Sequence, residues 1–334
     1  MARQRLGRGW AEAGQSRAQG QESTGPGGAR GLQILSKNAG EVCCRLPPVD
    51  RLLPLDGLRG LAVLLVLASH ASIEGFDLAP GLHASGLGIP GVFLFFVLSS
   101  FLLTGQLLDR ADRREPIGWR RFGARRLLRI LPAYALALGV HVIVGAFGPT
   151  DALQHLLMIR AQGHFWTIPV EVFFYLILPL LVLVLRPIVS AWWRSGVLLA
   201  AAVLLRWRFP SDFSVYAGTS TPIVAPYLPV FLVGAILAAL RPYWVSLDAG
   251  HQMRQRALRW LGTIAALALL VMTPSVWSAL SGMAFDHRRF HLQFDLFSGL
   301  WAFVIIAALQ GGGPLRALAS WAPLRGLGQI SYSV

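Results

Sequence analysis

An arginine and a histidine share one apolar segment of this chain, at a spacing that gives them a common face. The segment runs from Leu55 to Ala71, and Arg59 and His70 stand eleven positions apart in it. In a helix this is three turns plus about 20°, which aligns the two side chains roughly 16 Å apart along the axis. Charged groups inside a membrane span are costly and usually face an interior cavity, so the pair predicts a site. Alternatively, Arg59 snorkels to the headgroups while His70 lies in the opposite interface.

A basic stretch, residues 109–129, contributes two further cations at the edge of an apolar run. Arg126 and Arg129 are three positions apart, so they share one face of a helix. A guanidinium pair there suits a phosphorylated ligand that approaches from the cytoplasm. The alternative for the stretch as a whole is a stop-transfer cluster that contacts anionic lipid.

Glu171 is the only acid within its apolar run. A carboxylate about one turn into a membrane needs a partner, and Arg59, His70 or a ligand would serve. The alternative is an interfacial glutamate near a helix N-terminus, where the helix dipole favours it. Nearby Trp166 and Tyr175 are either aromatic anchors at the membrane interface or residues of the site.

Hydroxyl groups and histidines further along the chain are weaker candidates. Thr219, Ser220 and Thr221 stand at the mouth of an apolar run, where they bind an acceptor or simply cap the helix. His287 and His291 are four positions apart and would chelate a metal ion only with a third ligand, which is not evident. We therefore expect no metal.

The elements that must position these side chains are membrane-spanning helices. Hydrophobic residues make up 54% of the 334 residues and charged residues 14%, which is typical of polytopic membrane proteins. Eight apolar runs are long enough to cross a bilayer, and a ninth begins near residue 326. The eight runs are 56–73, 88–108, 127–147, 167–185, 190–206, 222–240, 258–273 and 292–309. The sequence thus predicts an all-α transmembrane bundle of about eight or nine spans.

The arginines predict the orientation of this bundle. With a cytoplasmic N-terminus, the cytoplasmic loops hold 16 arginines and the loops on the opposite side hold 5. This asymmetry follows the positive-inside rule, so we expect a multi-pass protein of the cell membrane with its N-terminus inside. The net charge of +14 is then largely topological, which argues against a nucleic acid partner. Residues 1–50 are expected to be a disordered basic tail ahead of a membrane domain at 51–334.

Five segments, taken in order along the chain, match the motifs of one known family. They are Asp56–Gly60 (DGLRG) with His70, Gly91–Ser99 (GVFLFFVLS), Arg125–Tyr134 (RRLLRILPAY), Phe165–Glu171 (FWTIPVE) and Tyr216–Thr221 (YAGTST). On these segments the sequence resembles the acyltransferase-3 family of polytopic membrane acyltransferases, from about residue 50 to the end. It departs from the family at Ser100, where Gly is usual, and at Pro169, Val172 and Phe173, which replace Ser, a second Glu and Gln.

The resemblance implies transfer of an acyl group, usually acetyl from acetyl-CoA, to a hydroxyl of a glycan or glycosylated acceptor. Such a reaction needs a base, and we assign that role to His70 because an imidazole titrates near neutral pH. Glu171 or Asp56 would orient the imidazole or balance the cationic lining of the site.

The same reaction needs positive charge to hold the donor. Arg126 and Arg129 would bind the phosphates of CoA at the cytoplasmic mouth, and Arg59 would attract the donor further in. The residues expected to contact the acceptor are Trp166, Thr167, Thr219 and Thr221. The partners expected are therefore acyl-CoA, a glycan or glycosylated small molecule, and the lipid bilayer.

Two other functions stay open at this point. A transporter of an anionic solute would also place Arg, His and Glu inside the bundle, and it would move its substrate without consuming acyl-CoA. A catalytically inactive scaffold would bind no donor. The resemblance also implies that Gly328–Val334 opens a late span of the family and that the last spans are absent, as in a fragment or a shortened product.

Overall fold

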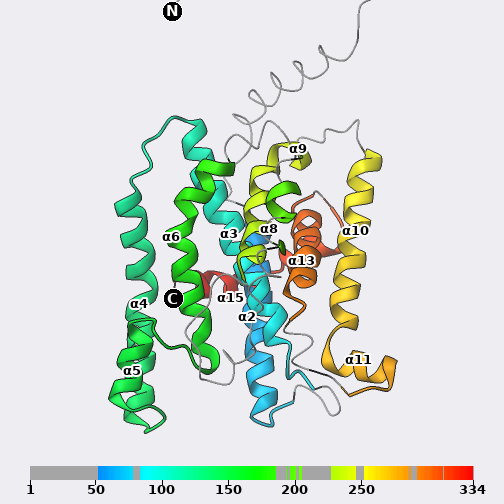
Figure 1. The fold of residues 1–334 in the computed structure, drawn as a ribbon. Helices are drawn as coiled ribbons and strands as arrows, with labels where there is room; N and C mark the ends of the chain where they lie inside the picture. The colour runs from blue at the N-terminus through cyan, green and yellow to red at the C-terminus, as the bar shows by residue number, and fades with distance from the viewer. Residues whose placement is uncertain are drawn as a thin grey trace, which may run out of the picture.

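The computed structural model describes most of the chain from residue 52 onward. The described residues are 52–77, 83–185, 193, 196–200, 203–204, 227–245, 252–284, 286, 292–310 and 312–333. Within these ranges every regular element is a helix and none is a strand, which confirms the predicted all-α fold (Figure 1). The tail 1–50 and the predicted acceptor residues Thr219 and Thr221 lie outside the described residues, as do His287 and His291.

Four helical segments of the described chain are long and apolar enough to cross a membrane. They are α2 (Leu53–Ile73), α3 (Gly88–Asp112), α4 (Trp119–Ile143) and the run that joins the short 3-10 turn η2 (Gly163–Trp166) to α6 (Thr167–Leu185). A fifth span results if α10 (Gln252–Val271) and α11 (Pro274–Ser281), bent by 80° at their junction, cross together. The predicted total of eight or nine spans and the cytoplasmic N-terminus stay predictions.

Two further apolar helices are shorter. α8 (Leu228–Ala239) has 12 residues and α13 (Phe294–Leu309) has 16. At 1.5 Å per residue they reach about 18 Å and 24 Å, less than the roughly 30 Å of a hydrocarbon core. The other helices whose bounds the structure describes are α5 (Pro149–Leu156), α9 (Arg241–Val245), α14 (Pro314–Ala319) and α15 (Ala322–Ser333).

The apolar runs located α2, α3 and α6 to within a few residues, but α4 differs from its prediction. Instead of 127–147 it spans Trp119–Ile143, because arginine is a good helix former and the basic stretch continues the helix. α5 and η2 lie within 148–166, which was predicted as a loop because it carries no long apolar run.

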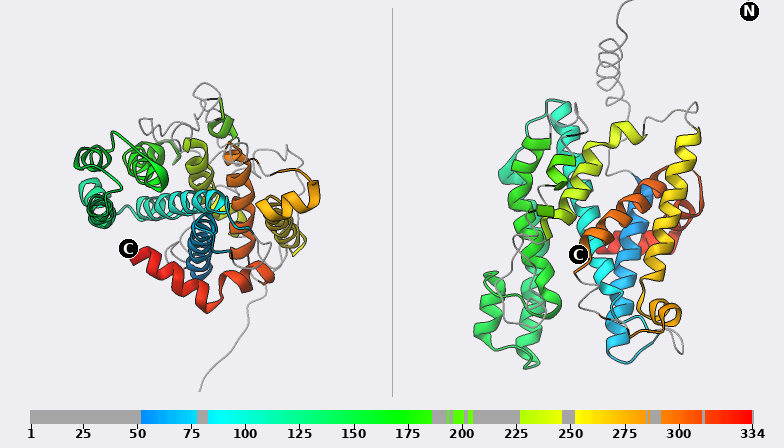
Figure 2. Two further views of the ribbon diagram at one scale, coloured as in Figure 1. Left: turned by 90° about the horizontal axis from the view of Figure 1, so that it is seen from below. Right: turned by 45° about the vertical axis from the view of Figure 1, so that its right-hand side comes forward.

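Helix α3 occupies the centre of the bundle and packs against α2, α6, α8 and α13 (Figure 2). Its contact with α8 is close because Gly234 has no side chain, and a Cβ there would overlap the carbonyl oxygen of Val97. Beside it, the Ser100 hydroxyl donates a hydrogen bond of 2.5 Å to the carbonyl oxygen of Phe231. The departure from the family pattern at Ser100 therefore lies in this helix contact.

The last two helices cross α2 at a backbone-to-backbone contact. α15 lies across α2 rather than alongside it (Figures 1 and 2). A Cβ at Gly57 would overlap the carbonyl of Ala319, one at Gly60 that of Leu324, and one at Gly328 that of Asp56. Small residues permit such close crossings of helices in membranes. Because Gly60 is the residue after Arg59, this helix crossing lies next to one of the predicted site residues.

Helices α4 and α5 stand at one edge of the bundle, beside α6 (Figure 2). Much of the apolar surface of α4 is uncovered, and Ile143 exposes 85% of its area. Exposed aliphatic side chains are expected where a helix faces lipid. The opposite face of α4 carries Arg126, Arg129 and Tyr134 toward the bundle.

Candidate functional site

A cavity of about 680 Å³ lies between the central helices and the edge of the bundle. One wall is formed by α2 and α3, the other by α4, η2 and α6, and α15 contributes one residue. Seven of the predicted site residues line this cavity together: Arg59, His70, Arg126, Arg129, Trp166, Thr167 and Glu171. Because α2 is continuous from Leu53 to Ile73, Arg59 and His70 stand roughly 16 Å apart along one helix.

Among the described residues, one ring nitrogen of His70 makes no hydrogen bond. Its Nδ1 lies 2.9 Å from the carbonyl oxygen of Val66, one turn earlier on α2. A carbonyl can only accept, so Nδ1 carries the hydrogen and Nε2 keeps its lone pair. The ring is exposed at the cavity, with the His164 ring 5.9 Å away in an edge-on arrangement. This is the tautomer that a general base requires.

Three guanidinium groups line the cavity further along α2 and on α4. Arg59 forms an ion pair of 2.9 Å with Asp56, so part of its charge is balanced within its own helix. Arg126 donates a hydrogen bond of 3.4 Å to the side-chain oxygen of Gln106 and lies over the Phe122 ring. Arg129 faces the same cavity one turn later. The surplus positive charge here suits a phosphorylated ligand.

Glu171 has partners other than the predicted Arg59 or His70. One carboxylate oxygen accepts hydrogen bonds from the Tyr175 hydroxyl at 2.5 Å and the Ser99 hydroxyl at 3.1 Å. Tyr175 lies one turn later on α6, and Ser99 faces it from α3. Likewise, neither Glu171 nor Asp56 hydrogen-bonds to His70 within the described chain, where Val66 orients the imidazole instead.

The aromatic residue predicted as an acceptor contact is part of the packing as well as of the cavity wall. Trp166 is only 3% exposed and its ring packs edge-on against Phe96 and at 4.9 Å from Tyr227. This burial argues against an interfacial anchor. The neighbouring Thr167 hydroxyl donates to the carbonyl oxygen of His164 at 3.4 Å. Among the residues that the structure describes, no group of three potential ligands is placed to hold a metal ion.

Several cavity residues were not singled out from the sequence. Ser99 and Gln106 line the cavity from α3, and His164 lines it from η2. Ser99 and Gln106 are seven positions apart, so their shared helix face was a readable signal. His164 had no such signal, because its importance comes from the His70 ring on another helix.

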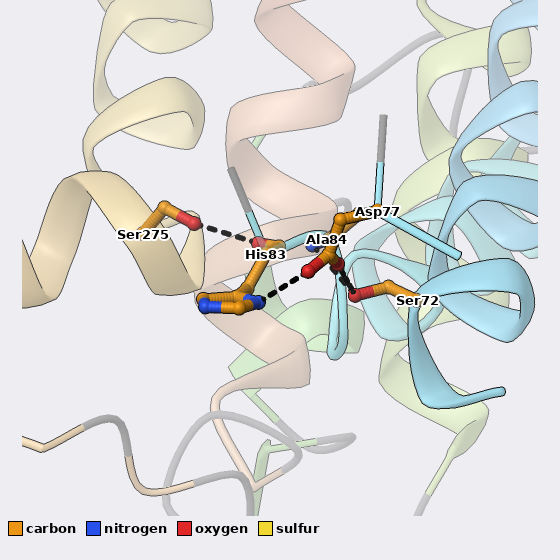
Figure 3. Close-up of polar contacts among 5 residues, drawn as sticks. All are labelled: Ser72, Asp77, His83, Ala84 and Ser275. Carbon is orange, nitrogen blue, oxygen red and sulfur yellow. Dashed lines mark hydrogen bonds and ion pairs between the residues drawn. The ribbon is translucent and has the colours of Figure 1, made fainter. Parts of the chain in front are cut away.

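The described residues between α2 and α3 (74–77 and 83–87, here the α2–α3 loop) are held in place near His70 by hydrogen bonds. Asp77 accepts a hydrogen bond of 2.5 Å from Ser72 and pairs with the His83 ring at 2.8 Å (Figure 3). Ser275 of α11 donates to the carbonyl oxygen of His83 at 2.7 Å, which links the loop to α11. The backbone N–H of Gly86 donates to Ser69, a cavity residue, at 3.1 Å. The loop thus borders the cavity without placing His83 in it.

His155 on α5 is fully buried against the face of Phe147, with Phe165 nearby. Burial lowers the pKa of its imidazole below the ordinary value. The charge of Arg160 adds to this shift of the pKa, whereas the Gln162 side chain and the charge of Asp151 oppose it. The imidazole therefore stays neutral in the folded protein at a pH where the unfolded chain already protonates it, from about 6.5 downward.

A dependence of stability on pH follows for His155. The unfolded state binds more protons below about pH 6.5, so the free energy of unfolding should fall as the pH drops through that value and level off below the lowered pKa. We expect His155→Phe to reduce the fall in melting temperature between pH 7.5 and pH 5.5, because it removes the group that titrates. Thermal unfolding in detergent, followed by tryptophan fluorescence, measures this, and identical pH slopes for both proteins would contradict it.

A family model described as an acyltransferase domain matches residues 53–334 of this chain. The peptidoglycan O-acetyltransferase OatA of Listeria monocytogenes is 26% identical over 317 residues, which cover 84% of this chain and 47% of that protein. The putative peptidoglycan O-acetyltransferase YrhL of Bacillus subtilis is 28% identical over 316 residues, with the same shares. The chain thus spans about half the length of these curated relatives. No solved structure matches it.

Proposed function

Since the chain belongs to the acyltransferase-3 family, as its motifs predicted, we propose that it moves an acyl group from acyl-CoA to a hydroxyl of a glycan or glycosylated acceptor. Acetyl is the acyl group proposed, in keeping with the names of the relatives. The observation that carries the proposal is one cavity shared by an imidazole with a free nitrogen and, further along, a cluster of guanidiniums. The separation of roughly 16 Å along α2 suits an extended pantetheine arm.

The donor binds with its phosphates on Arg126 and Arg129. Guanidinium forks make bidentate, charge-assisted hydrogen bonds to phosphate, and both side chains are half-buried on the cavity face of α4. Arg59 lies further along the cavity, where Asp56 fixes its position through their ion pair. Glu171, held by Tyr175 and Ser99, supplies a negative charge that balances part of this cationic lining.

The acyl transfer takes place at the other end, beside His70. Nε2 takes the proton of the acceptor hydroxyl as its oxygen attacks the thioester carbonyl carbon. A carbon–oxygen bond forms and the carbon–sulfur bond breaks, so the thiolate leaves with the electron pair. His70 then returns its proton to that thiolate, which releases CoA as the thiol and leaves the imidazole neutral for the next cycle.

The setting proposed for this reaction is the cell membrane, with the donor bound from the cytoplasm. The apolar helices support a membrane protein, and the asymmetry of the arginines supports the cytoplasmic side for the Arg126 end. The His70 end would then lie toward the opposite side, where envelope glycans are found. A peptidoglycan or other glycan acceptor rests on the names of the relatives.

Transfer of label tests the proposal directly. Membranes that contain the chain are incubated with radiolabelled acetyl-CoA and a crude envelope glycan fraction, beside membranes that lack it. We expect label in the glycan and one CoA thiol released per acetyl group transferred. No transfer and no CoA release would contradict the proposal, and uptake of an anionic solute without CoA release would support a transporter instead.

Loss of either guanidinium of the Arg126–Arg129 pair should weaken binding of the donor. Arg126→Ala and Arg129→Ala should each raise KM for acetyl-CoA by about 10- to 100-fold, because a hydrogen bond to a charged group contributes roughly 1.5–3 kcal/mol. The matched control is Arg125→Ala, since Arg125 is exposed on the same helix and does not line the cavity. Initial rates at varied acetyl-CoA measure the effect, and an equal KM for all four proteins would show that the pair does not hold the donor.

A further inference from the structure

Three imidazole rings from three elements lie in a row beside the cavity. The His164 ring of η2 is 5.9 Å from that of His70 on α2 and 5.6 Å from that of His141 on α4. His70 and His164 line the cavity, and His141 is not among its lining residues. The mechanism above uses only His70, so the neighbouring ring has no assigned task.

The hydrogen bonds of His70 and His141, on either side of His164, indicate which nitrogen of each ring carries the hydrogen. His141, like His70, directs Nδ1 at the carbonyl oxygen one turn earlier, at 2.8 Å from Ala137. Each therefore carries its hydrogen on Nδ1 and a lone pair on Nε2. In the part of the chain that the structure describes, the ring nitrogens of His164 make no hydrogen bond, and the ring is exposed at the cavity. Its N–H is thus available to a ligand.

A second proton in this row is disfavoured beside a first. Like charges repel at the 5.9 Å between the His70 and His164 rings, so a proton that His70 takes up during the reaction disfavours one on His164. The other titratable groups on the α5 side are the Arg160–Asp151 ion pair and the buried, neutral His155, whose ring lies 5.8 Å from that of Phe165. A neutral imidazole offers one N–H donor.

The reaction beside His70 needs such a donor. As the acceptor oxygen adds to the thioester, negative charge develops on the former carbonyl oxygen, and hydrogen-bond donors aimed at it stabilise the transition state. Two described hydroxyls on this part of the cavity, those of Tyr134 and Thr167, already donate to backbone carbonyls. The Ser69 oxygen accepts the N–H of Gly86, and the Ser69 side chain is buried. Within the described chain, the exposed His164 ring keeps an N–H that makes no hydrogen bond.

We propose that His164 is a catalytic residue that donates its ring N–H to the oxyanion of the tetrahedral intermediate formed beside His70. No bond to His164 forms or breaks, and its proton stays on the ring throughout. The inference rests on the proposed acyl transfer. It assigns the acyl carbonyl a place between the two imidazoles.

Two substitutions distinguish this role from others. His164→Phe keeps a planar ring against Phe165 but removes the N–H, so kcat should fall about 100- to 1000-fold with KM for acetyl-CoA unchanged. His164→Gln keeps an N–H donor of similar reach, so kcat should fall less than about tenfold. His83→Phe is the matched control, since His83 lies outside the cavity, and monodisperse elution in detergent checks folding.

Each result bears on one claim. Full activity of His164→Phe beside an active parent chain would overturn the oxyanion role and leave the acyl transfer standing. Equal losses in His164→Phe and His164→Gln would overturn it as well, because a proton carrier, unlike a donor, cannot be replaced by an amide. A rise in KM alone would assign His164 to ground-state binding. An inactive parent chain would instead count against the proposed function itself.

Discussion

His70→Ala should abolish acyl transfer while the protein remains folded. General bases contribute about 10²–10⁴-fold to such reactions, so the rate should drop by at least about 100-fold with acetyl-CoA still bound. The side chain is exposed at the cavity and its one hydrogen bond is to Val66 of its own helix, so little packing is lost. Transfer of radiolabelled acetyl groups to a glycan fraction measures the effect.

The control for this variant is another histidine close in sequence. His83→Ala removes an imidazole that pairs with Asp77 in the α2–α3 loop and lies outside the cavity. It should retain most of the activity. If His70→Ala transfers acetyl as fast as the parent chain, the base must be sought elsewhere, and the tautomer inferred for His70 would have no catalytic meaning.

Gly60→Ala, like Gly57→Ala, should cause a large loss of stability for so small a substitution in α2. A methyl group at Gly60 would overlap the carbonyl oxygen of Leu324, which is backbone and cannot turn aside. Helices α2 and α15 would have to separate, and overpacking of this kind costs typically about 1–3 kcal/mol, occasionally more. Thermal unfolding in detergent should show a clearly lower melting temperature, and Gly328→Ala should behave alike because its methyl group would overlap Asp56.

A glycine in an open part of another spanning helix provides the comparison. Gly139 of α4 has no atom within 4 Å of the position a Cβ would take. Gly139→Ala should therefore be neutral or stabilising by up to about 1 kcal/mol, since alanine favours a helix over glycine. Equal melting temperatures for Gly60→Ala and Gly139→Ala would mean that the close crossing does not form in the protein as purified.

The sequence predicted well those features that depend on one helix at a time. The apolar runs located α2, α3 and α6, and the eleven-residue spacing placed Arg59 and His70 on one face of α2. The predicted range of α4 began too late. Hydropathy excluded the arginines, although they lie in the first turns of the helix.

Features that depend on two distant segments were beyond the same reasoning. Glu171 was expected to need a partner, but Ser99 lies 72 positions earlier and its hydroxyl gave no sign of that contact. The glycine contacts between α2 and α15 likewise join the two ends of the described chain. Spacing within a helix determines which residues share a face, whereas helix packing determines which faces meet.

The crossing of α15 over α2 has a thermodynamic consequence for the donor. α15 places Ser331 in the wall of the cavity that also holds Arg59, while Gly60, the next residue, seats α15 on α2. A ligand whose affinity depends on that wall is therefore linked to the docking of α15. Linkage is reciprocal, so whatever factor docking adds to the affinity for the ligand, the ligand adds to the equilibrium for docking. The docking of α15 on α2 and the binding of a ligand in the cavity are therefore coupled equilibria.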